Sequence, residues 1–96
     1  MRVRLARLAQ QDIAAATEWY ELQRRGLGAR LLASVDRALR DAGDNPLRFA
    51  MIHGTVRRAM IEGFPYAAYF VVLEDYVRVV AVVHIRRDPE AWQSRE

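Results

Sequence analysis

The chain has 96 residues, 52% hydrophobic and 28% charged, a size and balance typical of one small globular domain rather than a disordered segment. It has no cysteine, which excludes disulfides, thiolate metal sites and a cysteine nucleophile and is in keeping with a cytoplasmic protein. The formal net charge is +3 and every basic residue is arginine, so no lysine can act as a proton donor or base. No apolar stretch approaches the roughly 20 residues that span a bilayer, so we expect no membrane partner.

The first quarter of the sequence predicts a strand followed by a helix. Residues 2–7 alternate between apolar and polar side chains, as in a strand with one wet face. Residues 10–25 have helical spacing, with Asp12 expected in the first turn, where the helix dipole favours an anion. The expected apolar stripe consists of Ile13, Ala16 and Tyr20, widened by Trp19 and Leu22.

A second helix is expected at about residues 29–42. It ends before Pro46, which disfavours helical geometry in the residue that precedes it. The short Gly26-Leu27-Gly28 link predicts that the two helices form an antiparallel hairpin. The expected apolar face of this helix consists of Leu32, Val35, Leu39 and Ala42, extended by Leu31 and Ala38.

The second half of the sequence predicts three strands, because the apolar period changes to two. We expect these strands at residues 56–61, 66–73 and 76–84, with His53 in the loop before them. The polar segment 86–96 predicts a short C-terminal helix, since Asp88 suits its cap and Pro89 its first turn.

The predicted order is β-α-α-β-β-β, which places the chain in the α+β class. The helical hairpin must lay its apolar stripe on one face of a small, mainly antiparallel sheet, because neither layer can bury itself alone. The other face of the sheet is expected to stay partly open and available for a function. We expect one domain that spans residues 1–96.

Several short motifs resemble those of the bacterial RelE/ParE toxin superfamily, and the resemblance covers nearly the whole chain. In the first half these are Trp19-Tyr20-Glu21, Gly26-Leu27-Gly28 and Asn45-Pro46. The second half contributes Arg57-Arg58, Phe64-Pro65-Tyr66, Tyr69, the valine-rich strand into His84, Arg86-Arg87-Asp88-Pro89, Trp92 and Arg95. The predicted order of helices and strands agrees with the RelE/ParE fold independently.

The resemblance implies the toxin of a type II toxin–antitoxin system, neutralised by a cognate antitoxin. ParE-like members inhibit DNA gyrase, whereas RelE-like members cut messenger RNA on the ribosome without a metal. The Phe64-Pro65-Tyr66 turn and the segment 84–92 are closer to the ParE-like branch. A gyrase inhibitor is therefore the favoured interpretation; the alternatives are an mRNA endoribonuclease and an interaction module that has lost toxicity.

A ribonuclease would have to activate the 2′-hydroxyl, stabilise phosphate charge and protonate the leaving oxygen. His84, Tyr66 and Tyr69 are the candidates for proton transfer, and His84 is the best of them because histidine titrates near neutral pH. The candidates for binding phosphate or a macromolecular target are Arg57, Arg58, Arg86 and Arg87. No cofactor and no metal cluster is expected.

Each of these residues also has a purely structural interpretation. His84 could be a strand-end histidine bonded to backbone, and alternation must send one of Arg57 and Arg58 towards the helices. Trp19 and Tyr20 are interpreted as hairpin core, and Trp92 as an anchor that packs the tail on the sheet. RelE-like nucleases commonly use several lysines or a late histidine or tyrosine, and the absence of both here favours binding over cleavage.

The expected partners are an antitoxin and a target, either gyrase or the ribosome with its mRNA. An amphipathic segment of the antitoxin should cover an apolar groove as a helix or add a strand at a sheet edge, giving a toxin–antitoxin hetero-oligomer.

Overall fold

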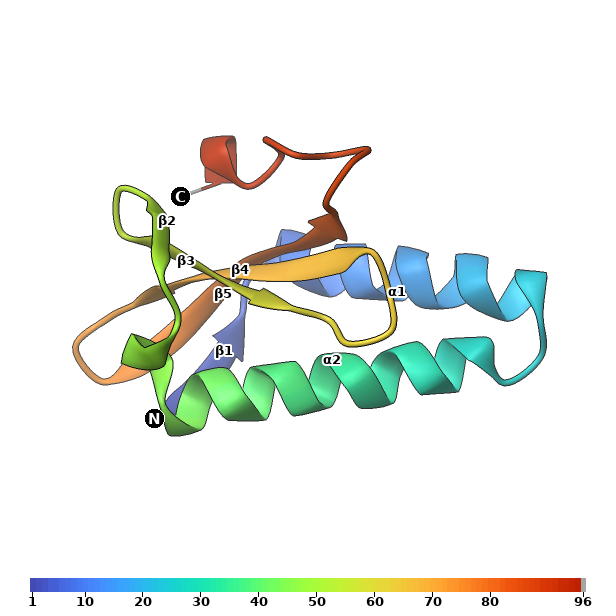
Figure 1. Cartoon of the computed structure of the whole chain (residues 1–96), viewed down its shortest axis with the longest axis horizontal. Coiled ribbons are helices and arrows are strands. Elements are labelled where there is room, and N and C mark those ends of the chain that lie inside the picture. The colour runs from blue at the N-terminus through green and yellow to red at the C-terminus, as the bar shows by residue number, and fades with distance from the viewer. Residues whose placement is uncertain (96) are drawn as a thin grey trace.

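Two helices and a five-stranded sheet form the fold in the computed structural model, which describes residues 1–95 (Figure 1). The elements are β1 (Arg2–Leu5), α1 (Arg7–Gln23), α2 (Leu27–Asp44), the 3-10 turn η1 (Pro46–Arg48), β2 (Met51–His53), β3 (Val56–Met60), β4 (Tyr66–Val72), β5 (Tyr76–His84) and the 3-10 turn η2 (Gln93–Arg95). Within these 95 residues, no helix has the length and apolarity needed to cross a membrane.

The sheet is mixed, with the strand order β1-β5-β4-β3-β2. β1 runs parallel to β5, with Val3 opposite Val77, and the other neighbours are antiparallel. The predicted α+β fold with a helical hairpin on a mainly antiparallel sheet is confirmed.

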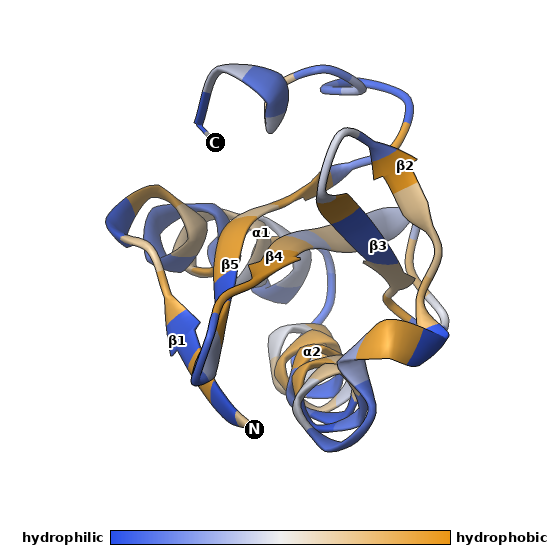
Figure 2. Cartoon of the chain, turned by 90° about the vertical axis from the view of Figure 1, so that its left-hand side faces the viewer, coloured by the Kyte–Doolittle hydropathy of each residue, from blue (hydrophilic) through white to orange (hydrophobic). Residues whose placement is uncertain are grey.

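The sheet separates two apolar clusters, one on each face. On one face, buried side chains of α1 and α2 such as Ala16, Leu31 and Val35 pack against Phe70 and Val79 of the central strands. Figures 1 and 2 show the hairpin on this side and the C-terminal segment on the other. β4 and β5 are buried from both sides, which accounts for their nearly continuous apolar sequence.

The second face is more covered than we expected, because the C-terminal segment lies across it. Trp92 is only 5% exposed and stacks on Tyr69, with ring centroids 5.1 Å apart and an interplanar angle of 12°. Its indole Nε1 donates to the Pro89 carbonyl at 2.8 Å. Trp92 is thus confirmed as the tail anchor, but the tail forms turns and the short η2 rather than a regular helix.

Several details of the helical hairpin were predicted wrongly. α1 begins at Arg7, so Asp12 lies in its second turn rather than its first. Trp19, Leu22 and Leu32 are exposed by 47%, 77% and 45% instead of facing the core. Leu22 and Leu32 make the side of the hairpin turned away from the sheet apolar as well, and spacing alone does not tell the two apolar sides apart.

The strand β2 was missed, and His53 lies in it rather than in a loop. β2 is three residues long and pairs irregularly with β3, with Met51 opposite Arg57 and His53 opposite Val56. The imidazole of His53 lies against the indole of Trp92, with centroids 5.6 Å apart. A strand this short shows no usable period.

The tight turn of the hairpin depends on two glycines and one carboxylate. Gly26 has a φ of 90°, which favours glycine. The Glu21 carboxylate accepts the N–H of Gly26 at 3.0 Å and that of Gly28 at 3.0 Å, satisfying donors at the start of α2. A Cβ on Gly28 would lie 2.8 Å from the Thr17 carbonyl oxygen, so α1 and α2 approach closely only because this residue has no side chain.

Gly28→Ala should lower the free energy of unfolding by about 1–2 kcal/mol. The overpacking costs about 1–3 kcal/mol and exceeds the gain of up to about 1 kcal/mol in helix propensity. Urea denaturation followed by circular dichroism checks this, with Ala29→Ser at the exposed neighbouring position as the control. Equal stability of Gly28→Ala and the native chain would contradict the close approach.

Candidate functional site

A cleft of about 270 Å³ opens between α1, the end of β5 and the start of the C-terminal segment. Chemically active side chains line it from three parts of the chain far apart in sequence. We call this site the β5-end cleft; its lining residues are Asp12, Ala15, Ala16, Trp19, Tyr66, Val82, Val83, His84, Arg87 and Asp88.

Tyr66 forms the inner wall of the β5-end cleft and is 7% exposed. Its ring packs edge-on against Tyr20 and His84, at centroid distances of 6.0 and 5.4 Å. Burial raises the pKa of the Tyr66 phenol above its ordinary value of 10.0, although the nearby Arg87 opposes this shift. The phenol is therefore protonated at neutral pH, which makes it a hydrogen-bond donor and not a base.

This shift in pKa predicts how stability depends on alkaline pH. Folding favours the neutral form of the Tyr66 phenol. Its contribution to the free energy of unfolding is therefore fully present below the pKa of the phenol in the unfolded chain, near 10, and is lost as pH rises through the higher pKa in the folded chain. Tyr66→Phe should remove this part of the alkaline loss. The check is to measure the free energy of unfolding at a series of alkaline pH values, with Tyr76→Phe as the control. If this free energy fell equally steeply with pH in Tyr66→Phe and in the native chain, the prediction would be refuted.

His84 ends β5, and its side chain is held by the turn that follows. Its Nδ1 accepts the backbone N–H of Arg86 at 3.0 Å and that of Arg87 at 3.2 Å. The neutral ring therefore carries its proton on Nε2, and protonation of Nδ1 would break both bonds. The structural interpretation of His84 is confirmed: its ring helps to form the turn that places Arg87.

Arg87 and Trp19 flank the mouth of the β5-end cleft, and both are exposed. The Arg87 guanidinium lies 5.8 Å from the centroid of the Trp19 ring, and its Nη2 donates to the Tyr66 hydroxyl at 3.1 Å. An exposed indole beside a fixed guanidinium can bind a flat or anionic group. Trp19 therefore lies at the mouth of the cleft, and the prediction that it belongs to the core is wrong.

The structure brings only three of the seven predicted site residues together, namely Tyr66, His84 and Arg87. Tyr69 is 2% exposed on the other face of the sheet, beneath Trp92. The side chain of Arg86 is exposed in the turn after β5 and does not line the cleft.

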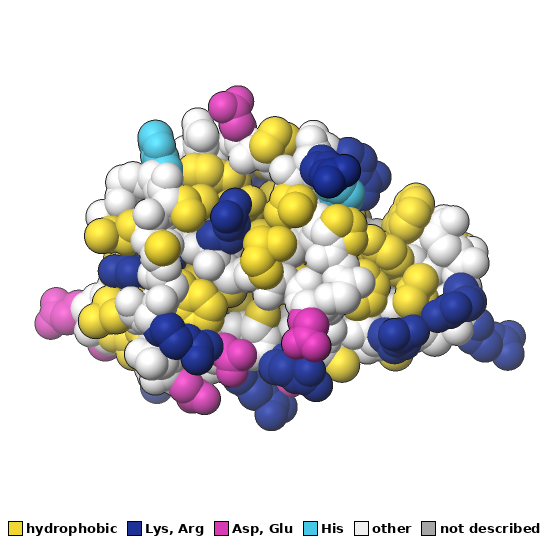
Figure 3. Space-filling model, in the orientation of Figure 1, with side chains coloured by type: hydrophobic (Ala, Val, Ile, Leu, Met, Phe, Trp, Pro, Cys, Tyr) yellow, Lys and Arg dark blue, Asp and Glu magenta, His cyan; other side chains and the backbone are white. Residues whose placement is uncertain are grey.

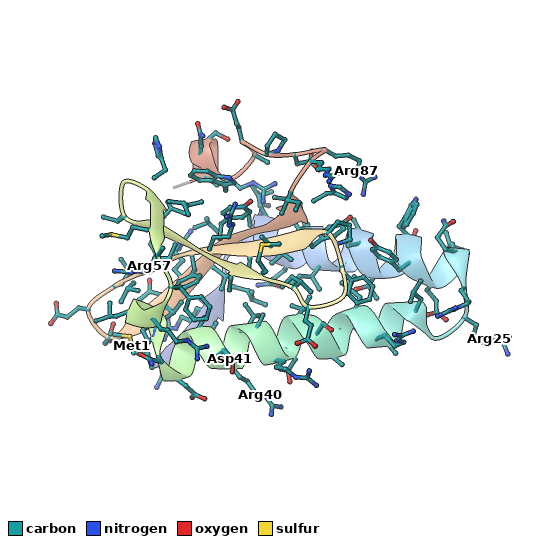
Figure 4. All side chains as sticks on the ribbon, in the orientation of Figure 1. Met1, Arg25, Arg40, Asp41, Arg57 and Arg87 are labelled. Carbon is teal, nitrogen blue, oxygen red and sulfur yellow. The ribbon has the colours of Figure 1, made fainter. Side chains whose placement is uncertain are left out.

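The two arginines of β3 lie away from the cleft on opposite faces of their strand. Arg57 shares the helix side with Ala59, and its Nη1 donates to the Phe49 carbonyl at 2.5 Å, which fixes the segment before β2. Arg58 is exposed and lies opposite Tyr69 in the register of β3 and β4. Figure 4 shows Arg57 and Arg87 at opposite ends of the sheet.

Asp12 and Arg95 form an ion pair that closes one side of the cleft and that the sequence did not indicate. Their side chains are 15% and 19% exposed. The Asp12 carboxylate also accepts the N–H of Val82 at 3.0 Å, and Arg95 Nη1 donates to the Val80 carbonyl at 3.3 Å. These contacts cover the edge of β5 beyond the end of β1. Asp12 and Arg95 are 83 residues apart, so no local pattern in the sequence could predict that they pair.

A second hollow, the hairpin groove, runs between the outer sides of α1 and α2 and has a volume of about 720 Å³. It is almost wholly apolar because Leu22 and Leu32 turn outward here. The lining residues are Gln10, Ile13, Ala14, Thr17, Glu18, Glu21, Leu22, Gly28, Ala29 and Leu32. An exposed apolar groove of this kind suits the apolar face of an amphipathic helix.

The β5-end cleft contains groups suited to binding, and the carboxylates of Asp12 and Asp88 also line it. It offers a cation, an exposed indole and a protonated phenol, while the accepting nitrogen of His84 is occupied by backbone. No group of three or more histidine, aspartate or glutamate side chains that could hold a metal occurs in the described part of the chain.

Comparison with known proteins identifies the fold. No family model matches the sequence, and no curated protein matches it. A chain of the solved structure described as "Chromosomal ParDE TA system from P. aeruginosa" superposes with a TM-score of 0.78, over 88% of this chain and 95% of that chain, at 16% sequence identity. The expected fold of RelE/ParE type is thereby confirmed; at this identity the likeness is one of fold.

Proposed function

We propose that this chain is the toxin of a bacterial type II toxin–antitoxin system and arrests growth by binding and inhibiting DNA gyrase. The observation that carries the proposal is the match of fold, over 88% of the chain, to a chain from a ParDE toxin–antitoxin system. The sequence motifs of the ParE-like branch support the choice of target. The protein would act in the cytoplasm, where gyrase is.

The make-up of the β5-end cleft supports inhibition by binding. Trp19 and Arg87 present an apolar surface and a cation at its mouth, and such residues are common at the centre of protein interfaces. Two of the three residues predicted to transfer protons lie in the cleft, and neither is a free base: the Nδ1 of His84 accepts from backbone and Tyr66 is protonated.

A cognate antitoxin would neutralise the toxin by covering its exposed apolar surface. The hairpin groove is the best place for an amphipathic helix, because it is apolar and both helices expose a leucine to it, Leu22 from α1 and Leu32 from α2. This interaction would give the expected toxin–antitoxin hetero-oligomer. It would also bury the most exposed leucine of the described chain, Leu22.

Inducible expression in a bacterium tests the class. We expect growth arrest, rescue by co-expression of a cognate antitoxin, to be sought as a small acidic protein encoded beside this gene, and weaker rescue of the Leu22→Ser/Leu32→Ser toxin. A matched pair of exposed leucines outside the groove, Leu8→Ser/Leu73→Ser, should still be rescued. Unaffected growth with soluble, folded toxin would contradict the proposal and favour a module without toxicity.

A metal-independent mRNA endoribonuclease is the second candidate, favoured by one observation: Tyr66, His84 and Arg87 meet in a single cleft. The exposed carboxylate of Asp88 in the same cleft would accept the proton of the attacking 2′-hydroxyl, and Arg87 would stabilise the phosphate charge. Tyr66 or the Nε2–H of His84 would protonate the leaving 5′-oxygen. Arrested cells then contain cleaved transcripts, and His84→Ala or Arg87→Ala abolishes cleavage. Intact transcripts during arrest would exclude this candidate.

A further inference from the structure

One stretch in the middle of the chain carries positive charge and no negative charge. Residues 46–61 contain Arg48, Arg57 and Arg58 and no acidic residue, so their formal charge is 3 − 0 = +3. The other 80 residues contain 12 arginines and 12 acidic residues, so their charge is 12 − 12 = 0. Residues 1–11 and 22–35 carry the same formal charge of +3, so what distinguishes this segment is the set of side chains exposed beside its arginines.

The segment folds into neighbouring elements at one edge of the sheet, which we call the η1–β3 patch. η1, β2 and β3 follow one another, β2 pairs with β3, and β2 ends the sheet. Arg48, His53 and Arg58 are exposed, and only Arg57 is tied to backbone. Figure 3 shows basic and apolar side chains mixed on this part of the surface, with acidic ones at its margins.

Four large apolar side chains are exposed within the η1–β3 patch. Leu47 is 69% exposed, Met51 57%, Met60 50% and Ile52 37%. Protein interfaces are enriched in methionine and arginine and depleted in lysine and acidic residues, which is the composition found here. Exposed arginines alone would also suit nucleic acid, but four exposed apolar side chains among them favour a protein.

We propose that the η1–β3 patch is a docking surface for an acidic segment of another protein that also carries apolar side chains. The patch wraps around the edge of the sheet, because Met51 lies opposite Arg57 on the helix side whereas Arg58 and Met60 point to the other side. Carboxylates of the partner would face Arg48 and Arg58, and its apolar residues would contact Met51 and Met60 from the two sides of this edge. This surface goes beyond the proposed function and does not depend on it. It is separate from the hairpin groove and from the β5-end cleft, since it shares no lining residue with either.

The shape of the edge indicates docking through side chains rather than addition of a strand. β2 has only three residues, and its register with β3 is irregular, as is common where an edge is protected against further pairing. The partner segment therefore recognises charge and apolar contacts. Its binding should weaken as salt is added.

Two pools of short labelled peptides test the proposal by fluorescence anisotropy. In the acidic pool, Asp or Glu alternates with Val, Ile, Leu or Phe; in the basic pool, Lys and Arg replace the acids. We expect the acidic pool to bind and the basic pool not to bind. Arg48→Glu/Arg58→Glu should weaken binding by at least about tenfold, and Met51→Ser/Met60→Ser by roughly fivefold.

The control is Arg24→Glu/Arg25→Glu, which makes the same change in charge at the exposed turn of the hairpin, the far end of the molecule (Figure 4). It should change binding by less than about twofold, because its charges lie far from the patch. Equal loss in both double variants, or no binding of the acidic pool, would overturn the proposal. Tighter binding of a short single-stranded DNA would overturn it in favour of nucleic acid, and a dimer that Arg48→Glu/Arg58→Glu dissociates would overturn it in favour of a second copy.

Discussion

Trp92→Ala is expected to lower the free energy of unfolding by about 3–5 kcal/mol, as for other large-to-small changes at buried aromatic residues. Trp92 is 5% exposed, stacks on Tyr69 and contacts the ring of His53. Its loss would open the second face of the sheet and release the segment that carries Arg87. Since small domains are stable by only about 5–15 kcal/mol, this is a large fraction of the total.

Trp19→Ala is the matched control, because it removes the same side chain from a site that is 47% exposed. We expect it to cost about 1 kcal/mol or less in stability while weakening any function of the β5-end cleft. Urea denaturation of both variants, followed by circular dichroism, checks the pair. Similar losses for the two tryptophans would contradict the assignment of Trp92 as the anchor.

The second large effect is expected for Arg95→Ala, which should cost about 2–3 kcal/mol. Breaking a buried ion pair costs about 3–5 kcal/mol, and the residual exposure of Asp12 and Arg95, 15% and 19%, reduces this figure. The Asp12 carboxylate would still accept the hydrogen bond from the N–H of Val82, but it would lose the positive charge of the Arg95 guanidinium. Arg95→Lys should be intermediate, since a lysine cannot bond both carboxylate oxygens as the guanidinium does.

The exposed pair Arg40–Asp36 provides the comparison, with side chains 76% and 60% exposed. Arg40→Ala should cost about 0.5 kcal/mol or less. A double-mutant cycle of Asp12→Ala and Arg95→Ala gives the coupling energy directly, and we expect it to exceed that of the exposed pair. A coupling energy near zero would show that the tail is held by Trp92 alone.

The fold could be predicted from the sequence because its main elements are long and regular. The apolar period of α2 indicates a helix, and the valine-rich sequence of β5 indicates a strand. Gly26 and Pro46 mark where α2 starts and ends. Alternation also predicted that Arg57 and Arg58 lie on opposite faces, although it could not say which faced the helices. The same alternation could have predicted that Tyr66 and Tyr69 lie on opposite faces of the sheet, since residues three apart on a strand point in opposite directions.

The site could be predicted only in part, because tertiary contacts decide it. The pairing of Asp12 with Arg95 joins residues 83 positions apart, and β2 is too short to show a period. Trp19 was assigned to the core because its hydrophobicity suits either the core or an exposed binding surface. The role of His84 as a backbone acceptor depends on the path of the turn after β5.

DNA supercoiling by purified gyrase in the presence of the purified chain tests the central proposal most directly. We expect supercoiling to fall as the chain is added, and Trp19→Ala and Arg87→Ala to restore it while remaining folded. Full supercoiling activity in a large excess of the folded native chain would contradict inhibition of gyrase.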